Sequence, residues 1–126
     1  MNYKIPMKTR KCILIVDDDS DVLLFLEDRL NALGYDVLAA TNGQEGLEVI
    51  HGHSVDGVLL DLDMPVMGGI PMLEKLGVSS ATPPVIVMSA NDHRPELQRA
   101  IVTGAMDFLI KPIAQDELAD KCLRLF

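Results

Sequence analysis

The stretch "DGVLLDLDMP", residues 56–65, contains the pattern that decides the fold. Its apolar run at residues 57–60 shows no polar alternation, which is typical of a strand buried on both faces of a parallel sheet. The run ends on Asp61, and Asp63 follows two residues later. Buried carboxylates need a partner or access to water. The stretch therefore predicts a buried strand that delivers acids to a site at its carboxyl end.

The rest of the chain repeats this alternation of short apolar runs and helical spacing. Apolar runs predict strands at residues 12–16, 35–40, 57–60, 85–88 and 107–110. Helical spacing predicts helices at residues 20–33, 44–51, 70–76, 94–103 and 114–126, with Gly34 and Gly77 where helices commonly end. Five strands that alternate with five helices predict an α/β fold, with a doubly wound parallel sheet covered on both faces.

Composition limits the classes of function. The 126 residues predict one domain, at residues 11–126, after an N-terminal extension at residues 1–10. The net charge of −8 argues against direct nucleic-acid binding and against an anionic membrane surface as partner. No apolar stretch approaches the roughly 20 residues of a membrane span, so we expect a cytoplasmic protein. In that setting Cys12 and Cys122 are expected to be buried thiols.

Polar residues gather where the predicted strands end. Asp17 and Asp18 follow the first strand, Asp61 and Asp63 the third, Ser89 the fourth and Lys111 the fifth. In parallel sheets these ends meet at one edge, where ligands bind. Several carboxylates at close range repel one another, and a hard cation such as Mg²⁺ relieves that repulsion. A carboxylate, a metal, a lysine and a hydroxyl are together suited to holding a phosphoryl group.

Four motifs occur in an order and spacing that resemble those of receiver domains of two-component response regulators, the CheY-like superfamily. They are "LIVDDDSD" (14–21), "LLDLDMPVMGG" (59–69), "VIVMSA" (85–90) and "FLIKP" (108–112). The resemblance implies a flavodoxin-like (βα)5 fold with strand order 2-1-3-4-5. It implies that Asp61 is the phosphoacceptor and that Ser89 and Lys111 bind the phosphate. It implies that Mg²⁺, with Mn²⁺ as a possible substitute, is held by Asp17, Asp18, Asp61 and the backbone carbonyl of Asp63. It also implies that Phe108 stands where the family keeps a rotating aromatic residue. It also implies a cis Lys111–Pro112 bond.

The same resemblance implies a function. Asp61 would take a phosphoryl group from a phosphohistidine on a sensor histidine kinase or a phosphotransfer protein. The chain would not be an enzyme beyond slow self-catalysed phosphorylation and dephosphorylation. Phosphorylation would switch the face formed by the fourth helix, fifth strand and fifth helix, which a downstream protein partner or effector domain would read, without direct contact to nucleic acid or membrane.

Other interpretations compete with these. "LLDLDMP" (59–65) also resembles the nucleophile motif of haloacid-dehalogenase-like phosphohydrolases, although here it ends the third strand instead of the first. A receiver-like scaffold that is never phosphorylated is the second alternative. Asp17 and Asp18 could belong to an ordinary helix N-terminus, and Phe108 could be a static core residue. Met106 stands where many DNA-binding regulators carry an acid used in dimer salt bridges, so that dimer is not assumed.

Overall fold

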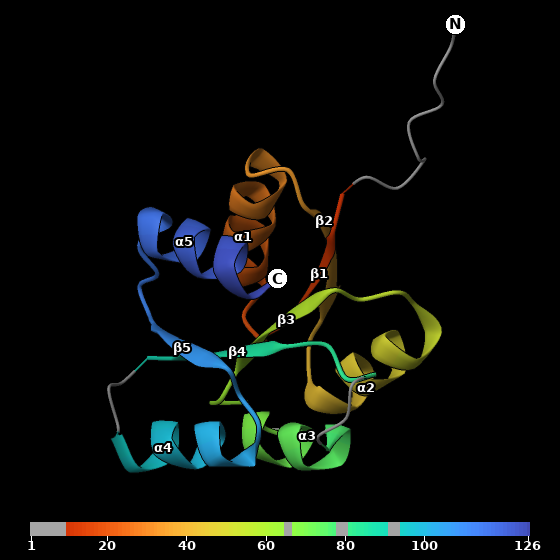
Figure 1. Cartoon of the computed structure of the whole chain (residues 1–126), viewed down its shortest axis with the longest axis vertical. Coiled ribbons are helices and arrows are strands. Elements are labelled where there is room, and N and C mark those ends of the chain that lie inside the picture. Colours follow the sequence, from red (N-terminus) through yellow and green to blue (C-terminus); the bar gives the residue numbers. More distant parts are fainter. Residues whose placement is uncertain (1–9, 65–66, 78–80, 91–93) are drawn as a thin grey trace, which may run out of the picture.

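The computed structural model describes residues 10–64, 67–77, 81–90 and 94–126. Figure 1 shows a single sheet with helices on both sides. The strands are β1 (Cys12–Val16), β2 (Asp36–Ala40), β3 (Gly57–Asp61), β4 (Val85–Ser89) and β5 (Asp107–Ile110), and the helices are α1 (Ser20–Ala32), α2 (Gly43–Gly52), α3 (Gly69–Leu76), α4 (Arg94–Thr103) and α5 (Gln115–Leu125). None of these helices is long and apolar enough to cross a membrane.

All four strand pairings are parallel, and the order across the sheet is β2-β1-β3-β4-β5. The predicted doubly wound flavodoxin-like topology is therefore confirmed. The register pairs Asp61 at the end of β3 with Met88, and Ser89 at the end of β4 with Ile110. The strands thus end at one edge of the sheet, which brings their following residues together.

The helices divide between the two faces of the sheet. In Figure 1, α1 and α5 lie on one side of the sheet and α3 and α4 on the other. Leu47 of α2 and Leu97 of α4 belong to one buried apolar cluster, whereas Leu26 of α1 and Leu118 of α5 belong to a second. Side chains on a strand point alternately to the two faces. The sheet therefore separates two cores. Alternate residues of each strand contribute their side chains to one core or to the other.

Local sequence explains the bounds of the elements. Every residue of β1, β3 and β4 is buried, so these strands appear in the sequence as uninterrupted apolar runs. The side chain of Asp19 accepts a hydrogen bond from the Asp21 amide and begins α1. Gly34 and Gly77 follow α1 and α3 with φ of 98° and 68°, a conformation that favours glycine. Helix α5 begins one residue later than expected, because Ala114 has extended backbone angles at its N-cap.

The final residue packs against the amino end of β3. A Cβ atom built on Gly57 would lie 2.4 Å from Cδ1 of Phe126, so the Phe126 ring fills the space that a side chain at position 57 would need. Lys11 Nζ donates a hydrogen bond to the Phe126 carbonyl oxygen. Phe126 is thereby fixed at the edge of the sheet opposite the strand ends that carry Asp61 and Ser89.

Candidate functional site

Three carboxylates meet at the carboxyl ends of β1 and β3. One oxygen from each of Asp17, Asp18 and Asp61 lies within 4.8 Å of the others. Asp17 is fully buried and Asp61 is 2% exposed, while Asp18 is exposed. The Asp19 amide donates to Asp17 Oδ1 at 2.9 Å, which fixes the Asp17 side chain. The expected acidic cluster is therefore present, with one acid open to solvent and two beneath it.

Lys111, directly after β5, reaches into this cluster. Its Nζ lies 2.8 Å from Asp17 Oδ2 and 3.5 Å from Asp61 Oδ2. The Lys111–Pro112 bond is cis, as the resemblance implied. The Lys111 amide also donates to the Ser89 carbonyl oxygen at 2.8 Å, which ties the end of β5 to the end of β4. The sequence placed Lys111 among these acids, but it did not reveal that Asp17 is the closer partner.

Burial and neighbouring charges shift the pKa values of Asp61 and Lys111 in the cluster. The pKa of the Asp61 carboxyl is raised from 3.8 to about 6. Burial is the largest cause and the charge of Asp17 adds to it, while the hydrogen bond from the Asp63 amide and the charge of Lys111 act in the opposite direction. Burial alone would lower the pKa of Lys111, but its hydrogen bond to Asp17 and the charge of Asp61 outweigh that effect and raise it. One lysine thus balances only part of the negative charge.

Asp63 and Ser89 border the cluster. The Asp63 amide donates to Asp61 Oδ1 at 3.1 Å, so Asp63 helps to orient the Asp61 carboxylate through its backbone. The exposed side chain of Asp63 reaches toward β4, with Oδ2 3.5 Å from both Ser89 Oγ and the Ala90 amide nitrogen. Ser89 is 1% exposed. Both residues therefore lie at the predicted site, on the side of Asp61 that faces the end of β4.

Phe108 lies apart from the acids. It is the second residue of β5 and is 36% exposed, so its ring is only partly buried. Its ring lies under Lys121 of α5, with Nζ 5.0 Å from the ring centroid. This contact could not be predicted from the sequence, because no local pattern relates a residue of β5 to one in α5.

The donor set fits a hard divalent cation. Asp17, Asp18 and Asp61 offer carboxylate oxygens, which are the ligands that Mg²⁺ prefers, and the exposed Asp18 leaves one side open to water and phosphate oxygens. The pKa of Asp61 is raised mainly by burial, with a further contribution from the charge of Asp17, so a cation beside these carboxylates would favour the ionised form of Asp61. Asp17, Asp18 and Asp61 are therefore arranged as a site that a metal ion would stabilise.

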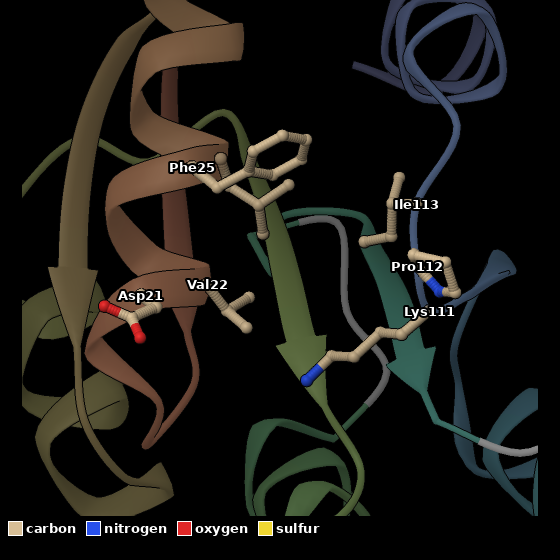
Figure 2. A pocket seen from close by; sticks show the side chains of 7 residues that line it. Asp21, Val22, Phe25, Lys111, Pro112 and Ile113 are labelled. Carbon is tan, nitrogen blue, oxygen red and sulfur yellow. The ribbon is translucent and has the colours of Figure 1, made fainter.

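An apolar groove adjoins the cluster. It has a volume of about 480 Å³ and lies between α1 and the loop after β5. Figure 2 shows Val22 and Phe25 of α1 on one side and Pro112 and Ile113 on the other, with Lys111 extending along one end. Val22 and Phe25 were assigned to the first helix from the sequence, but the groove depends on how that helix packs beside the loop.

Comparison with known proteins gives one consistent result. The family model described as "Response regulator receiver domain" matches residues 13–123. The transcriptional regulatory protein PrrA of Mycobacterium tuberculosis is 37% identical over 106 residues, which cover 84% of this chain and 46% of PrrA. The chain thus spans about half the length of this curated relative.

Solved structures agree. The signal receiver domain of a Bermanella marisrubri response regulator has a TM-score of 0.84 at 30% identity, with 93% of this chain and 98% of that chain covered. A CheY-like response regulator receiver domain protein from Methanospirillum hungatei has a TM-score of 0.82 at 28% identity, with 92% and 93% covered.

The match also decides between the interpretations. The matched residues, 13–123, include all four sequence motifs of the receiver domain family, so the phosphohydrolase alternative is wrong. Members of this family act as phosphoacceptors in two-component signalling, and their acidic triad, here Asp17, Asp18 and Asp61, binds Mg²⁺. The chain belongs to the response regulator receiver domain family.

Proposed function

We propose that Asp61 accepts a phosphoryl group from a phosphohistidine on a sensor histidine kinase or a phosphotransfer protein. One observation carries the proposal, namely the position of Asp61 beside both the Asp17–Asp18 pair and Lys111. The Lys111 ammonium lies 3.5 Å from Asp61 Oδ2. A buried carboxylate with a cation and a metal-binding pair beside it has what a phosphoryl acceptor needs, because such transfer depends on positioning and on charge neutralisation.

In this transfer an Asp61 oxygen attacks phosphorus while the phosphorus–nitrogen bond to the donor imidazole breaks, which yields an aspartyl phosphate and a free imidazole. The Asp63 amide holds Asp61 Oδ1 at 3.1 Å and so orients the carboxylate. Lys111 Nζ donates to a phosphoryl oxygen, and the Ser89 hydroxyl, on the same side as Asp63 Oδ2, donates to another. Each of these groups lies at the end of a strand or within two residues of it.

Asp17, Asp18, Asp61 and the backbone carbonyl of Asp63 are proposed to hold Mg²⁺, with Mn²⁺ as a possible substitute. When bound, the cation supplies positive charge to the carboxylates and to the incoming phosphoryl oxygens. The proximity of the three carboxylates, within 4.8 Å, supports this assignment. Lys111 Nζ, 2.8 Å from Asp17 Oδ2, balances part of the negative charge of these carboxylates.

The apolar groove is the proposed contact for the phosphodonor protein. Lys111 lines the groove and also reaches Asp61, so the two features are continuous. A histidine side chain is short, so the segment that carries the phosphohistidine must lie close to Asp61 during transfer. Val22 and Phe25 provide apolar surface in this groove for such a segment.

Phosphorylation is proposed to bias the conformation of the face formed by α4, β5 and α5. Ser89 pairs with Ile110, and its carbonyl oxygen accepts the Lys111 amide, so a change at Ser89 reaches β5 directly. Ile101, Val102 and Phe108 expose apolar surface on this face. A downstream protein partner or an effector domain is the proposed reader of the change.

The first test is incubation with acetyl phosphate and Mg²⁺, followed by intact mass measurement. We expect one phosphoryl adduct that hydroxylamine removes and that chelation of Mg²⁺ prevents. The variant Asp61→Asn should give no adduct, whereas Asp28→Asn, which neutralises an exposed acid on α1, should behave as the native chain does. An adduct that persists in Asp61→Asn would move the acceptor elsewhere. No adduct in the native chain would favour the scaffold that is never phosphorylated.

A further inference from the structure

Lys121 of α5 contacts the first two residues of β5, Asp107 and Phe108. Its Nζ lies 3.2 Å from Asp107 Oδ1 and 3.7 Å from Glu117 Oε1, and it donates a hydrogen bond to the Phe108 carbonyl oxygen. The Lys121 side chain is only 15% exposed. An ammonium group has three N–H donors, and here three oxygens surround it. These contacts hold the ammonium group of Lys121 in one place, whereas the ammonium group of an ordinary surface lysine moves freely in solvent.

The contacts of Lys121 hold its ammonium group over an aromatic ring. Lys121 Nζ lies 5.0 Å from the centroid of the Phe108 ring, within the range of a cation–π interaction. Phe108 is 36% exposed, so a large apolar side chain stays at the surface while Lys121 lies above it. The cation–π contact favours this outward position of the ring.

The Phe108 ring also borders a cavity. The cavity has a volume of about 370 Å³ and lies between α4 and β5. Leu97, Ile101 and Val102 of α4 supply most of its apolar lining, and Phe108 forms part of the wall. Entry of the Phe108 ring into this space would bury apolar surface and would give up the contact with Lys121. The contact with Lys121 and the apolar cavity would therefore favour different positions of the ring.

We propose that Lys121 is a positioning residue that holds Phe108 in its outward position, and that loss of the Lys121 charge allows the ring to enter the cavity beside α4. The proposal deepens the proposed function, since it rests on Phe108 as part of the face that responds to phosphorylation. It adds a residue on α5 that opposes the response. Phosphorylation at Asp61 then has to overcome the contact between Lys121 and the ring.

The test follows the ring directly. The chain has three phenylalanines, so labelling with 4-fluorophenylalanine gives three ¹⁹F signals, and Phe108→Leu identifies the one from position 108. Ring-to-methyl NOEs from Phe108 to Leu97 and Ile101 report the inward position. Lys121→Met and Lys121→Gln remove the charge, and Lys121→Arg keeps a cation that can lie on the ring. Lys75→Met serves as the matched control, because Lys75 is an exposed lysine on α3.

For the unphosphorylated protein we expect both charge-removing variants to shift the Phe108 signal in the same direction and to raise the inward population about two- to fivefold. Lys121→Arg and Lys75→Met should leave the signal at its native position. A Phe108 signal and NOE pattern unchanged in Lys121→Met and Lys121→Gln would overturn the proposal. A shift that Lys121→Arg shares would also overturn it, because it would indicate a loss of packing.

This experiment separates the two proposals. The ring is observed without any phosphodonor, so a failure of Asp61 to form an adduct leaves the Lys121 measurement unaffected. If the adduct forms, the Phe108 signal of the phosphorylated native chain should shift in the same direction as that of Lys121→Met. A shift in the opposite direction would contradict the role of Lys121 in opposing the response.

Discussion

The carboxylate of Asp61 is almost fully buried beside Asp17 and Asp18, so its ionisation costs the folded state free energy. The pKa of Asp61 is raised from 3.8 to about 6, mainly by burial. Because the folded pKa lies above the unfolded one, the folded chain holds this proton more tightly than the unfolded chain does. The destabilisation is therefore absent below pH 3.8, grows toward pH 6 and is complete above it.

We accordingly expect Asp61→Asn to raise the free energy of unfolding at pH 7.5, without metal, by roughly 1–3 kcal/mol. The gain should shrink as the pH falls toward 4, because Asp61 in the native chain then becomes neutral. Urea denaturation in the presence of EDTA at both pH values measures this. Asp28→Asn is the matched control and should change stability little. A gain that is the same at both pH values would show that ionisation of Asp61 is not its cause.

Cys122 provides a second prediction for a single residue. Burial raises the pKa of its thiol to about 12, so the thiolate that reacts with disulfide reagents is scarce at neutral pH. We expect Cys122 in a Cys12→Ala background to react with a colorimetric disulfide reagent only as fast as the chain opens, and rapidly in urea. An added Lys75→Cys should react at once in the folded chain, since position 75 is exposed. Rapid labelling of Cys122 under native conditions would contradict its burial.

At the scale of the elements, the stability of α2 depends on the residue that caps its N-terminus. The Asn42 side chain accepts a hydrogen bond from the Glu45 amide at 2.9 Å and so satisfies one of the free donors at the start of the helix. We expect Asn42→Ala to lower the free energy of unfolding by about 0.5–2 kcal/mol, measured by urea denaturation. Asn42→Asp keeps an acceptor and should retain most of the stability. Gln44→Ala, in the first turn of the same helix, should have little effect, and an equal loss there would contradict the capping role.

The elements were predictable because each has a local cause. Buried strands such as β1 and β3 give continuous apolar runs, and Gly34 ends α1 with a positive φ that favours glycine. The acids were predictable because Asp61 and its partners follow strand ends, and parallel topology brings these together. The contact between Lys121 and Phe108 could not be predicted, because it depends on the packing of α5 against β5 and on side-chain conformations that no local pattern encodes.

For the molecule as a whole, one sheet joins two cores. Leu97 lies in the core under α4 and Leu118 in the core under α5, and strand residues in between contribute to both. Loss of packing on one face should therefore weaken the sheet that supports the other. A single domain of this size commonly unfolds in one cooperative transition.

We expect Leu97→Ala and Leu118→Ala each to lower the free energy of unfolding by about 2–5 kcal/mol. Native-state hydrogen exchange should show that either variant reduces the protection of the β3 amides to the same extent as its global loss of stability. Val102→Ala removes an 87% exposed side chain from α4 and should change protection little. If Leu118→Ala weakened α1 and α5 but left β3 and β4 fully protected, the two cores would unfold independently.

The fit of Phe126 against Gly57 has a consequence for evolution. A Cβ atom at position 57 would overlap the Phe126 ring, so the size of one side chain limits the size of the other. The two positions lie far apart in the sequence, yet a mutation at one changes which mutations are neutral at the other. Descendants of this chain should therefore gain a side chain at position 57 only after position 126 has become smaller, and the order of the two substitutions is constrained.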